Sequence, residues 1–458
     1  MAQKPSVPRG TRDFSPVEML RRNYIFDTIR RTFSLYGYLP LETPAMENLT
    51  TLLGKYGEEG DRLIFRILNS GNFLADVPLS ALSSADIAAV TQNISEKGLR
   101  YDLTVPFARY VVQHRDEITF PFRRYQIQPV WRADKPQKGR YREFFQCDVD
   151  VIGSNSLLNE FELIRIIDRV FSELNINVII NVNNRKILAG IAATAGAGDR
   201  ITDITVAIDK LEKIGSEGVR QELLQRGITP EVIRRLTPFL SLRGSAAEKI
   251  AGLKREIAAS PEGEKGISEM EELFSYLDME PSQAKVVFDL SLARGLNYYT
   301  GTIIEVKAAD MAIGSICGGG RYDDLTGIFG LPGVSGVGVS FGADRIYDVM
   351  LNLGLFPEQT GSSTSVLVIN FGGEELPELI KIAAALRGAG VATELFPDAV
   401  RLKKQFSYAD TQHIPLVIIA GSEEIKASQA TVRNMKTGEQ TTVSLSALPE
   451  FIREAKNR

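Results

Sequence analysis

Apolar and polar residues alternate along the chain in patterns that predict a mixture of helices and strands. Ser15-Pro16-Val17-Glu18 predicts a helix start, because Ser caps well, Pro suits the first helical position and Glu completes a capping box. Apolar residues then recur at helical spacing as far as Tyr36-Gly37. FRRYQIQPVWR and YREFFQCDVDVIG are rich in aromatic and β-branched residues. We therefore expect an antiparallel pair of strands joined by the basic loop ADKPQKGR.

The order of these patterns predicts several domains. Residues from about 185 to 280 show helical patterns only and lie between two β-rich blocks, so they indicate a helical insertion. Residues 355–365, LFPEQTGSSTS, predict a linker because they combine Pro, Gly, Ser and Thr. Strands and helices alternate after this linker, which predicts a separate α/β domain with a mostly parallel sheet. A length of 458 residues agrees with two or three domains.

Composition argues against several functional classes. The chain has no run of about 18 apolar residues, and its N-terminus lacks the apolar stretch of a secretory signal, so we expect neither membrane insertion nor secretion. Cys147 and Cys317 are interpreted as reduced, cytosolic thiols. The two histidines, His114 and His413, lie far apart, which argues against a zinc site or a histidine-based triad. Arginines, carboxylates, glycines and the backbone therefore remain to carry any chemistry.

One segment is strongly basic in a mildly acidic chain. The chain has 53 basic and 57 acidic residues, whereas residues 131–142 contain five Lys or Arg and one acid. Because alternate residues of a strand share a face, the following side chains should point the same way: Arg140, Arg142, Phe144, Gln146, Asp148 and Asp150. Such a face is either a solvated surface with scattered ion pairs or the base of a binding site. In the second case Arg would bind phosphate, Phe144 would stack on a planar ring, and Gln and Asp would bind an ammonium group. The aromatic ring beside two arginines favours the second interpretation.

Four other segments carry candidate groups. ARGLNYYTG (293–301) indicates either interface packing by its tyrosines or an oxyanion site at its arginine. Three consecutive glycines in ICGGGRYDDL (316–325) indicate close approach of a ligand or of a neighbouring backbone, without the GK[ST] of a P-loop. In GVGVSFGADRIYDVM (336–350) a small-residue strand leads into a helix whose Arg345 could stack over a base. Asp102-Leu103-Thr104 lies at a strand end, a pattern that is more often a helix cap than a site.

Together and in this order, these segments resemble a class II aminoacyl-tRNA synthetase of the histidyl-tRNA synthetase family. RGTRDFSP opens the resemblance, YGYLPLETPAMEN resembles motif 1, FRRYQIQPVWRADKPQKGRYREFFQCDVDVIG resembles motif 2 and GVGVSFGADRI resembles motif 3. ARGLNYYTG and GGGRYDDL are similar to the two segments characteristic of the histidine-specific enzymes. DLTVPFARY and REFFQCDVD look closer to the eukaryote-like branch of that family.

The resemblance implies a domain plan. It implies an α+β catalytic domain with a mainly antiparallel sheet, formed by residues 1–184 and 281–354. Residues 185–280 would form a helical insertion domain, 355–365 a linker and 366–458 a C-terminal α/β anticodon-binding domain. Residues 366–458 contain 11 basic and 11 acidic residues, and RLKKQFSYAD is their one basic cluster. This cluster is either a solvated helix face or a contact for RNA.

The resemblance also implies roles for individual residues. The implied histidine-binding residues are Asp102, Thr104, Arg132, Gln146, Asp150, Arg294, Tyr298 and Tyr299. The implied ATP-binding residues are Arg132, Asp134, Arg140, Phe144 and Arg345. Arg132 and Arg294 would be catalytic, at the reacting carboxylate and the α-phosphate. Asp134 replaces the Glu that is common in the family, and GADR stands where GLER is frequent.

The implied reaction joins histidine to ATP as histidyl-adenylate, releases pyrophosphate and then transfers histidine to histidine tRNA. Carboxylate attack on phosphate needs two anions held in line and their charge neutralised, which arginines can do without a histidine or a protein nucleophile. Mg²⁺ would accompany ATP, with no metal site made by protein side chains. The resemblance further implies a cytoplasmic homodimer supported by motif 1.

Two alternatives remain from the sequence. The synthetase-like regulatory subunit of ATP phosphoribosyltransferase is a non-enzymatic relative, but such subunits generally lack the anticodon-binding domain that this chain resembles. A general nucleotide-dependent ligase or kinase would be expected to carry a P-loop or a kinase motif set, and neither occurs in the sequence.

Overall fold

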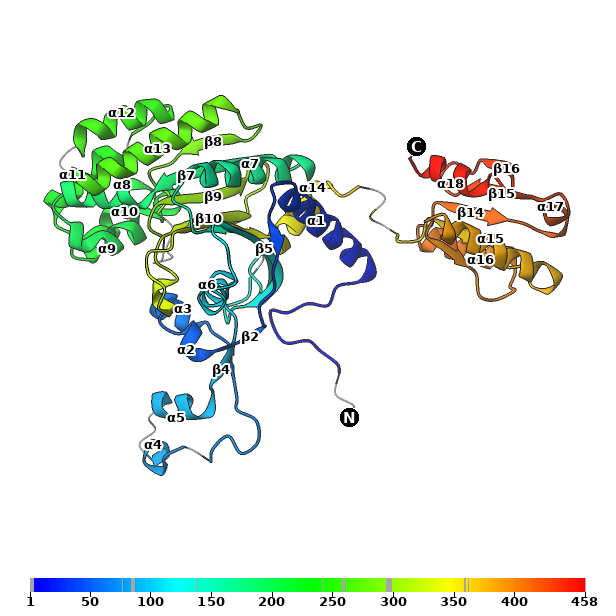
Figure 1. The fold of residues 1–458 in the computed structure, drawn as a ribbon, viewed down its shortest axis with the longest axis horizontal. Coiled ribbons are helices and arrows are strands. Elements are labelled where there is room, and N and C mark those ends of the chain that lie inside the picture. The colour runs from blue at the N-terminus through cyan, green and yellow to red at the C-terminus, as the bar shows by residue number, and fades with distance from the viewer. Residues whose placement is uncertain are drawn as a thin grey trace. The chain divides into compact units, whose positions relative to one another are not determined.

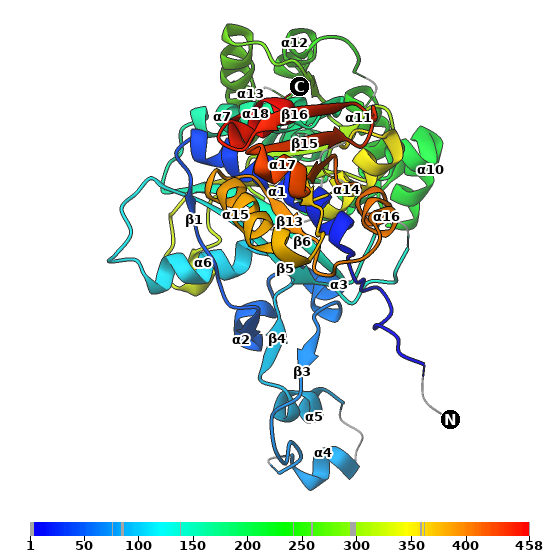
Figure 2. The ribbon, with the colours of Figure 1, turned by 90° about the vertical axis from the view of Figure 1, so that its right-hand side faces the viewer.

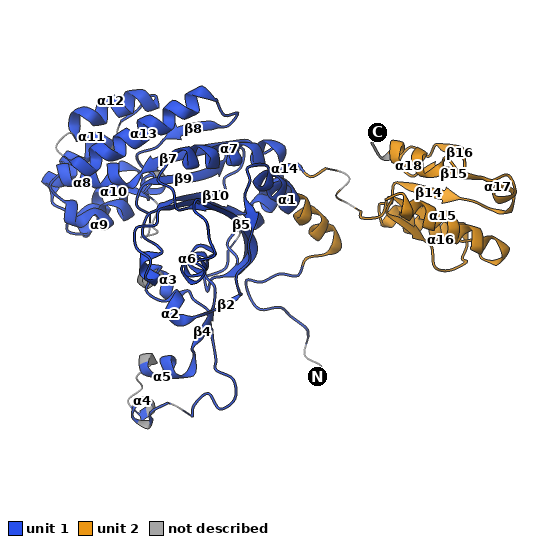
Figure 3. Cartoon of the chain, in the orientation of Figure 1, with its two compact units in different colours: residues 1–13, 25–355 blue, residues 14–24, 356–458 orange. Residues whose placement is uncertain are grey.

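The chain folds into two compact units in the computed structural model, which describes residues 4–75, 77–83, 87–137, 139–240, 242–257, 260–293, 299–357, 360 and 362–457. Unit 1 comprises residues 1–13 and 25–355, and unit 2 comprises residues 14–24 and 356–458 (Figure 3). The first half of helix α1 (Pro16–Leu35) therefore groups with unit 2. The capping box predicted for this helix is confirmed, because Ser15 N–H donates to Glu18 Oε2 at 2.7 Å and Glu18 N–H to Ser15 Oγ at 3.4 Å.

An eight-stranded sheet forms the centre of unit 1 (Figure 1). In spatial order its strands are β1 (Leu39–Pro40), β5 (Phe122–Trp131), β6 (Glu143–Ile152), β11 (Gly336–Gly342), β10 (Cys317–Tyr322), β9 (Thr302–Ala308), β7 (Val178–Asn184) and β8 (Lys285–Phe288). Neighbouring strands run antiparallel except in the outer pairs β1–β5 and β7–β8. The mainly antiparallel sheet implied by the sequence is thereby confirmed.

Helices cover the sheet, and a smaller sheet extends from it. Outside residues 185–284, the described helices of unit 1 besides α1 are α2 (Leu49–Leu52), α3 (Gly57–Arg62), α4 (Leu79–Ser83), α5 (Ile87–Ile94), α6 (Thr104–Gln113), α7 (Leu158–Glu173), α14 (Ala343–Leu353) and the 3₁₀ turn η2 (Gly327–Phe329). The small antiparallel sheet has the order β2 (Met46–Asn48), β4 (Lys97–Leu99), β3 (Arg66–Ile67). Beyond it, α4 and α5 project away from the large sheet (Figures 1 and 2).

The described residues between β7 and β8 are helical. Their elements are α8 (Arg185–Thr194), η1 (Gly198–Arg200), α9 (Ile201–Ile208), α10 (Leu211–Gln225), α11 (Pro230–Leu240), α12 (Ala246–Glu256) and α13 (Pro261–Met279). Side-chain caps fix several of the starts: Asn184 accepts a hydrogen bond from Lys186 N–H at α8, Ser245 forms a capping box with Glu248 at α12, and Ser260 accepts a hydrogen bond from Gly263 N–H before α13. These helices belong to the same compact unit as the sheet.

The two faces of the large sheet differ in character. On one face, the Phe341 ring of β11 lies 5.6 Å from Phe171 of α7 and 5.8 Å from Phe33 of α1. This face is the apolar core. On the opposite face, β6 presents Phe144, Gln146, Asp148 and Asp150 at alternate positions, as the sequence predicts.

The glycine-rich passage contains a strand that the sequence does not predict. Residues 317–322 form β10, paired with both β9 and β11. A side chain at Gly319 would overlap the Gly338 carbonyl of β11, and one at Gly320 would overlap the Thr302 carbonyl of β9. The run of glycines therefore lets three strand backbones approach closely, although glycine ordinarily weakens a strand.

Unit 2 contains its own five-stranded sheet and a set of helices. The strand order is β13 (Thr393–Leu395), β12 (Val366–Val368), β14 (Leu416–Ile419), β15 (Gln429–Asn434), β16 (Gln440–Ser444). The helices are α15 (Leu376–Gly388), α16 (Leu402–Thr411), α17 (Ser422–Lys426), α18 (Leu448–Asn457) and the 3₁₀ turn η4 (Gly373–Glu375). β13, β12 and β14 are parallel, but β14, β15 and β16 pair antiparallel. The prediction of a mostly parallel sheet is therefore wrong for its second half.

No helix within the described parts of the chain combines the length and the apolar character needed to cross a membrane.

Candidate active site

A cavity lies on the polar face of the large sheet, over β6, β10 and β11. The resemblance implies twelve substrate-binding residues, and nine of them line this cavity: Asp102, Thr104, Arg132, Arg140, Phe144, Gln146, Asp150, Tyr299 and Arg345. Asp134 lies beside the cavity and forms an ion pair with Arg140 at 2.6 Å. Arg294 and Tyr298 fall outside the described residues. The geometry thus brings together residues that lie up to 243 positions apart, from Asp102 to Arg345.

Arg132 lies against two aromatic rings at the end of β5. Its guanidinium carbon is 4.2 Å from the centre of the Tyr101 ring and 5.2 Å from that of Phe144. Its Nε–H donates to the Tyr101 carbonyl at 3.1 Å. These contacts fix the guanidinium, and its Nη groups make no hydrogen bond to the described residues that would compete with an anion.

Two further arginines are held at the cavity by different partners. Arg140 donates to Asp134 Oδ1, and its side chain is about half exposed. Arg345 donates from Nε to the Gly139 carbonyl at 3.0 Å and from Nη1 to the Ser315 carbonyl at 2.7 Å. These two hydrogen bonds hold the Arg345 guanidinium at the cavity, where a base could stack on it.

Carboxylates gather at the buried part of the same cavity. Burial is the main cause that raises the pKa of Asp102, Asp148 and Asp150, and it raises that of Asp148 to about 7. Asp102 Oδ1 accepts hydrogen bonds from the Tyr56 hydroxyl at 3.0 Å and from Val105 N–H at 3.1 Å. A cavity with fixed arginines and several buried carboxylates is suited to a ligand that carries both anionic and cationic groups.

Comparison with known proteins assigns the family. A family model of histidyl-tRNA synthetase matches residues 82–346, and one of an anticodon binding domain matches residues 365–455. The chain belongs to the histidyl-tRNA synthetase family. The histidine–tRNA ligase of Bacteroides fragilis is 57% identical over 448 residues, which cover 98% of this chain and 99% of that protein. Histidyl-tRNA synthetase from Nostoc has a crystal structure with a TM-score of 0.85 at 32% identity, covering 99% of this chain and 100% of that one.

A solved structure whose description names the regulatory-subunit alternative shares the fold of this synthetase. A structure from Bacillus halodurans described as an ATP phosphoribosyltransferase regulatory subunit/histidyl-tRNA synthetase has a TM-score of 0.70 at 22% identity and covers 88% of this chain. That likeness shows the architecture alone. The high identity to histidine–tRNA ligases over nearly the whole length and the matched anticodon binding domain identify the chain as an aminoacyl-tRNA synthetase.

Several residues that line or support the synthetase cavity were not assigned a role from the sequence. Asp150 Oδ1 accepts a hydrogen bond from the Tyr322 hydroxyl at 2.6 Å, and Asp150 Oδ2 forms an ion pair with Arg124 Nη2 at 2.9 Å. A side chain at Gly338 would overlap the Asp150 carboxylate. Tyr322 and Gly338 lie in two of the quoted motifs, but only the strand register shows that both meet Asp150.

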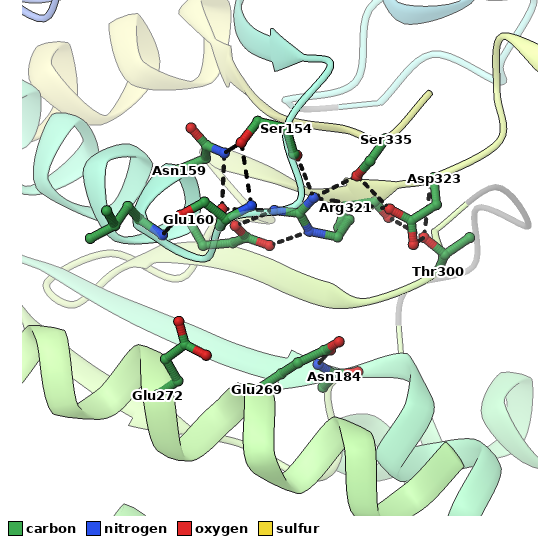
Figure 4. A network of polar contacts seen from close by, with 12 residues as sticks. Ser154, Asn159, Glu160, Asn184, Glu269, Glu272, Thr300, Arg321, Asp323 and Ser335 are labelled. Atoms are coloured by element: carbon green, nitrogen blue, oxygen red, sulfur yellow. Dashed lines mark hydrogen bonds and ion pairs between the residues drawn. The ribbon is translucent and has the colours of Figure 1, made fainter. Parts of the chain in front are cut away.

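A buried polar network fixes the segment that leads into the cavity (Figure 4). Arg321 of β10 donates from Nε and Nη2 to the two carboxylate oxygens of Glu160 in α7, both at 2.6 Å, and from Nη1 to Ser335 Oγ at 2.6 Å. Ser335 donates to Asp323 Oδ1, and the Thr300 hydroxyl donates to Asp323 Oδ2 at 2.7 Å. Thr300 follows Tyr299 directly, so the arginine of GGGRYDDL holds one end of the ARGLNYYTG segment in place.

Proposed function

We propose that the synthetase activates histidine with ATP in this cavity. The observation that supports this most directly is the row of side chains on β6, where an aromatic ring, an amide and carboxylates alternate beside Arg132. Phe144 would stack on adenine, with Arg345 on the other side of the base. Asp102, Thr104 and Gln146 would accept hydrogen bonds from the α-ammonium of histidine. Asp150 and Tyr299 would face the imidazole, with Tyr298 beside them.

The first step needs positioning and charge neutralisation rather than a protein nucleophile. A carboxylate oxygen of histidine attacks the α-phosphorus of ATP, and the bond to the bridging oxygen of pyrophosphate breaks. Arg132 would hold the carboxylate and the α-phosphate together, and Arg294 would neutralise the charge that develops between them. Arg140, oriented by Asp134, would contact the outer phosphates.

The second step transfers histidine to tRNA. A ribose hydroxyl of the terminal adenosine attacks the carbonyl carbon of histidyl-adenylate, and AMP leaves. Unit 2 would bind the anticodon end, and the basic face of α16 is one candidate contact because Arg401, Lys403 and Lys404 line a shallow cavity there. Loss of tRNA binding on reversal of these charges, with histidine activation intact, would support that contact.

Mg²⁺ would enter with ATP. Among the residues that the structure describes, no group of three or more His, Cys, Asp or Glu side chains lies together as a metal site. The ion would therefore take most of its ligands from phosphate oxygens and water, as Mg²⁺ commonly does with nucleotides. Its chemical contribution would be to neutralise the phosphate charge.

We also propose a cytoplasmic homodimer. The motif 1 segment exposes Leu39 and Met46, which are 63% and 54% accessible, and such apolar side chains suit a subunit interface. Sedimentation velocity should give the mass of two chains, and a single-chain mass at micromolar concentration would contradict the proposal. Cell fractionation tests the location.

Histidine-dependent exchange of labelled pyrophosphate into ATP tests the proposed function. We expect exchange with histidine and none with the other nineteen amino acids. Exchange with a different amino acid would overturn the specificity, and no exchange at all would overturn the assignment of the cavity to amino-acid activation.

Replacement of Phe144 by alanine tests the adenine site. Loss of base stacking on an aromatic ring costs about 1–3 kcal/mol, so the KM for ATP in the exchange reaction should rise about 5- to 150-fold. The KM for histidine should change little. A rise in the KM for histidine with an unchanged KM for ATP would show that Phe144 serves the amino acid instead.

A further inference from the structure

Asp148 is a buried carboxylate of the cavity to which none of the roles described so far is assigned. It lies on β6 between Gln146 and Asp150, lines the cavity and is 2% exposed. Its Oδ1 atom is buried and accepts no hydrogen bond from the described residues. An unpaired acceptor in a buried site costs free energy, so its presence indicates a donor that arrives with the ligand.

The neighbouring side chains are committed elsewhere. Arg124 forms its ion pair with Asp150 and its hydrogen bond with Gln126, and although its charge lowers the pKa of Asp148, its guanidinium makes no hydrogen bond to Asp148 Oδ1. Gln126, directly opposite Asp148 in the β5–β6 register, donates its amide to Thr43 at 2.9 Å and to Gln128 at 2.5 Å. Among the described residues, one guanidinium therefore lies beside the carboxylates of Asp148 and Asp150, and Asp148 Oδ1 accepts no hydrogen bond.

Ser340 couples Asp148 to Gln146. Ser340 faces Asp148 in the β6–β11 register. Burial raises the pKa of Asp148, Arg124 lowers it, Asp150 raises it, and a hydrogen bond from the Ser340 hydroxyl lowers it. Because the hydroxyl hydrogen is used in this way, the Ser340 oxygen accepts from Gln146 Nε2, at 2.7 Å. With its Nε2 atom bonded to Ser340, Gln146 offers its Oε1 atom to a ligand as an acceptor. This atom is buried and accepts no hydrogen bond from the described residues, and the Gln146 residue is 9% exposed.

We propose that Asp148 binds the α-ammonium of histidine directly, and that through Ser340 it also sets the amide of Gln146 to accept a second hydrogen bond from the same group. A primary ammonium has three donors and no acceptor. Two of them would go to the open acceptors of Asp148 and Gln146, which leaves the third for Asp102 or Thr104. A metal ion fits less well, because no metal-binding cluster occurs among the described residues. The inference rests on the proposed histidine site and adds to it a charged ligand for the ammonium.

Binding of three ligands to the full-length protein tests this assignment. Histidine and histidinol carry the ammonium and the imidazole, whereas 3-(imidazol-4-yl)propionate lacks the ammonium. Calorimetry should show that Asp148→Asn weakens histidine and histidinol about 10- to 100-fold, the range for a lost hydrogen bond to a charged group. Binding of the propionate should stay within about threefold of wild type, because it loses no such bond.

Two further variants complete the experiment. Asp168→Asn removes a buried carboxylate in α7, outside the cavity, and should bind all three ligands as the wild type does. Ser340→Ala frees the amide of Gln146 and should weaken only the two ammonium ligands, by several-fold, which keeps the test available if Asp148→Asn fails to fold.

The outcomes separate this inference from the proposed function. Equal weakening of all three ligands by Asp148→Asn would show a merely structural role and overturn the inference. Unchanged binding of histidine by Asp148→Asn would overturn it as well, with the proposed function intact. Failure of the wild-type protein to bind histidine would instead overturn the proposed function.

Discussion

Replacement of Arg132 by alanine is expected to lower kcat/KM for histidine-dependent pyrophosphate exchange by about 10²–10³-fold, as loss of one donor to a developing oxyanion does. The guanidinium lies in the cavity between Tyr101 and Phe144, and the reaction brings two anions together there. Most of the effect should appear in kcat, because Arg132 is proposed to act on the charge that develops in the transition state. Arg132→Lys should recover only part of the activity, since an ammonium lacks the planar fork.

Arg123→Ala is the matched control for this variant. Arg123 lies on the same strand β5 but pairs with Glu162 at 2.7 Å and is absent from the cavity lining. Its removal should leave the exchange rate within about threefold of wild type, because a partly exposed ion pair contributes little. Equal losses for the two variants would contradict the assignment of Arg132 to the reacting groups.

Replacement of Arg321 by methionine is expected to lower the free energy of unfolding by about 3–5 kcal/mol, as removal of one partner of a buried ion pair does. Glu160 is fully buried, so the variant would leave its carboxylate without the guanidinium that binds both of its oxygens. Urea unfolding measures the change. The variant should also lose activity, since Arg321 supports Ser335 and through it Asp323, which holds Thr300.

The double variant Glu160→Gln/Arg321→Met separates charge from packing. It removes the uncompensated charge together with the guanidinium and should regain a substantial part of the lost stability. A double variant as unstable as Arg321→Met would contradict the buried-charge explanation and point to lost packing or to the lost bonds to the Ser154 and Ser156 carbonyls.

The polar floor of the cavity could be predicted from sequence because it is a local property. Strand alternation alone places Phe144, Gln146, Asp148 and Asp150 on one face, and the structure has them there. The capping box at Ser15 and the antiparallel β5–β6 pair are local patterns of the same kind and are confirmed.

Features that depend on register between distant strands could not be predicted in this way. The bond from Tyr322 to Asp150 joins residues 172 positions apart, and the open acceptor of Asp148 depends on which contacts Gln126 and Arg124 of the neighbouring strand make. The sequence of β10 does not indicate a strand, because its glycines oppose strand propensity and serve close backbone contact instead. The prediction of a mostly parallel sheet in unit 2 is wrong for its second half because an alternation of strands and helices gives no sign of the antiparallel hairpin β15–β16.

The central claim is that one cavity on the polar face of the large sheet holds both substrates in a defined order. A crystal structure of the full-length synthetase with a non-hydrolysable histidyl-adenylate analogue tests it most directly. We predict adenine between Phe144 and Arg345, the acyl-phosphate linkage beside Arg132 and the imidazole at Asp150. An analogue bound elsewhere, or bound with its adenine at Asp150, would contradict this account.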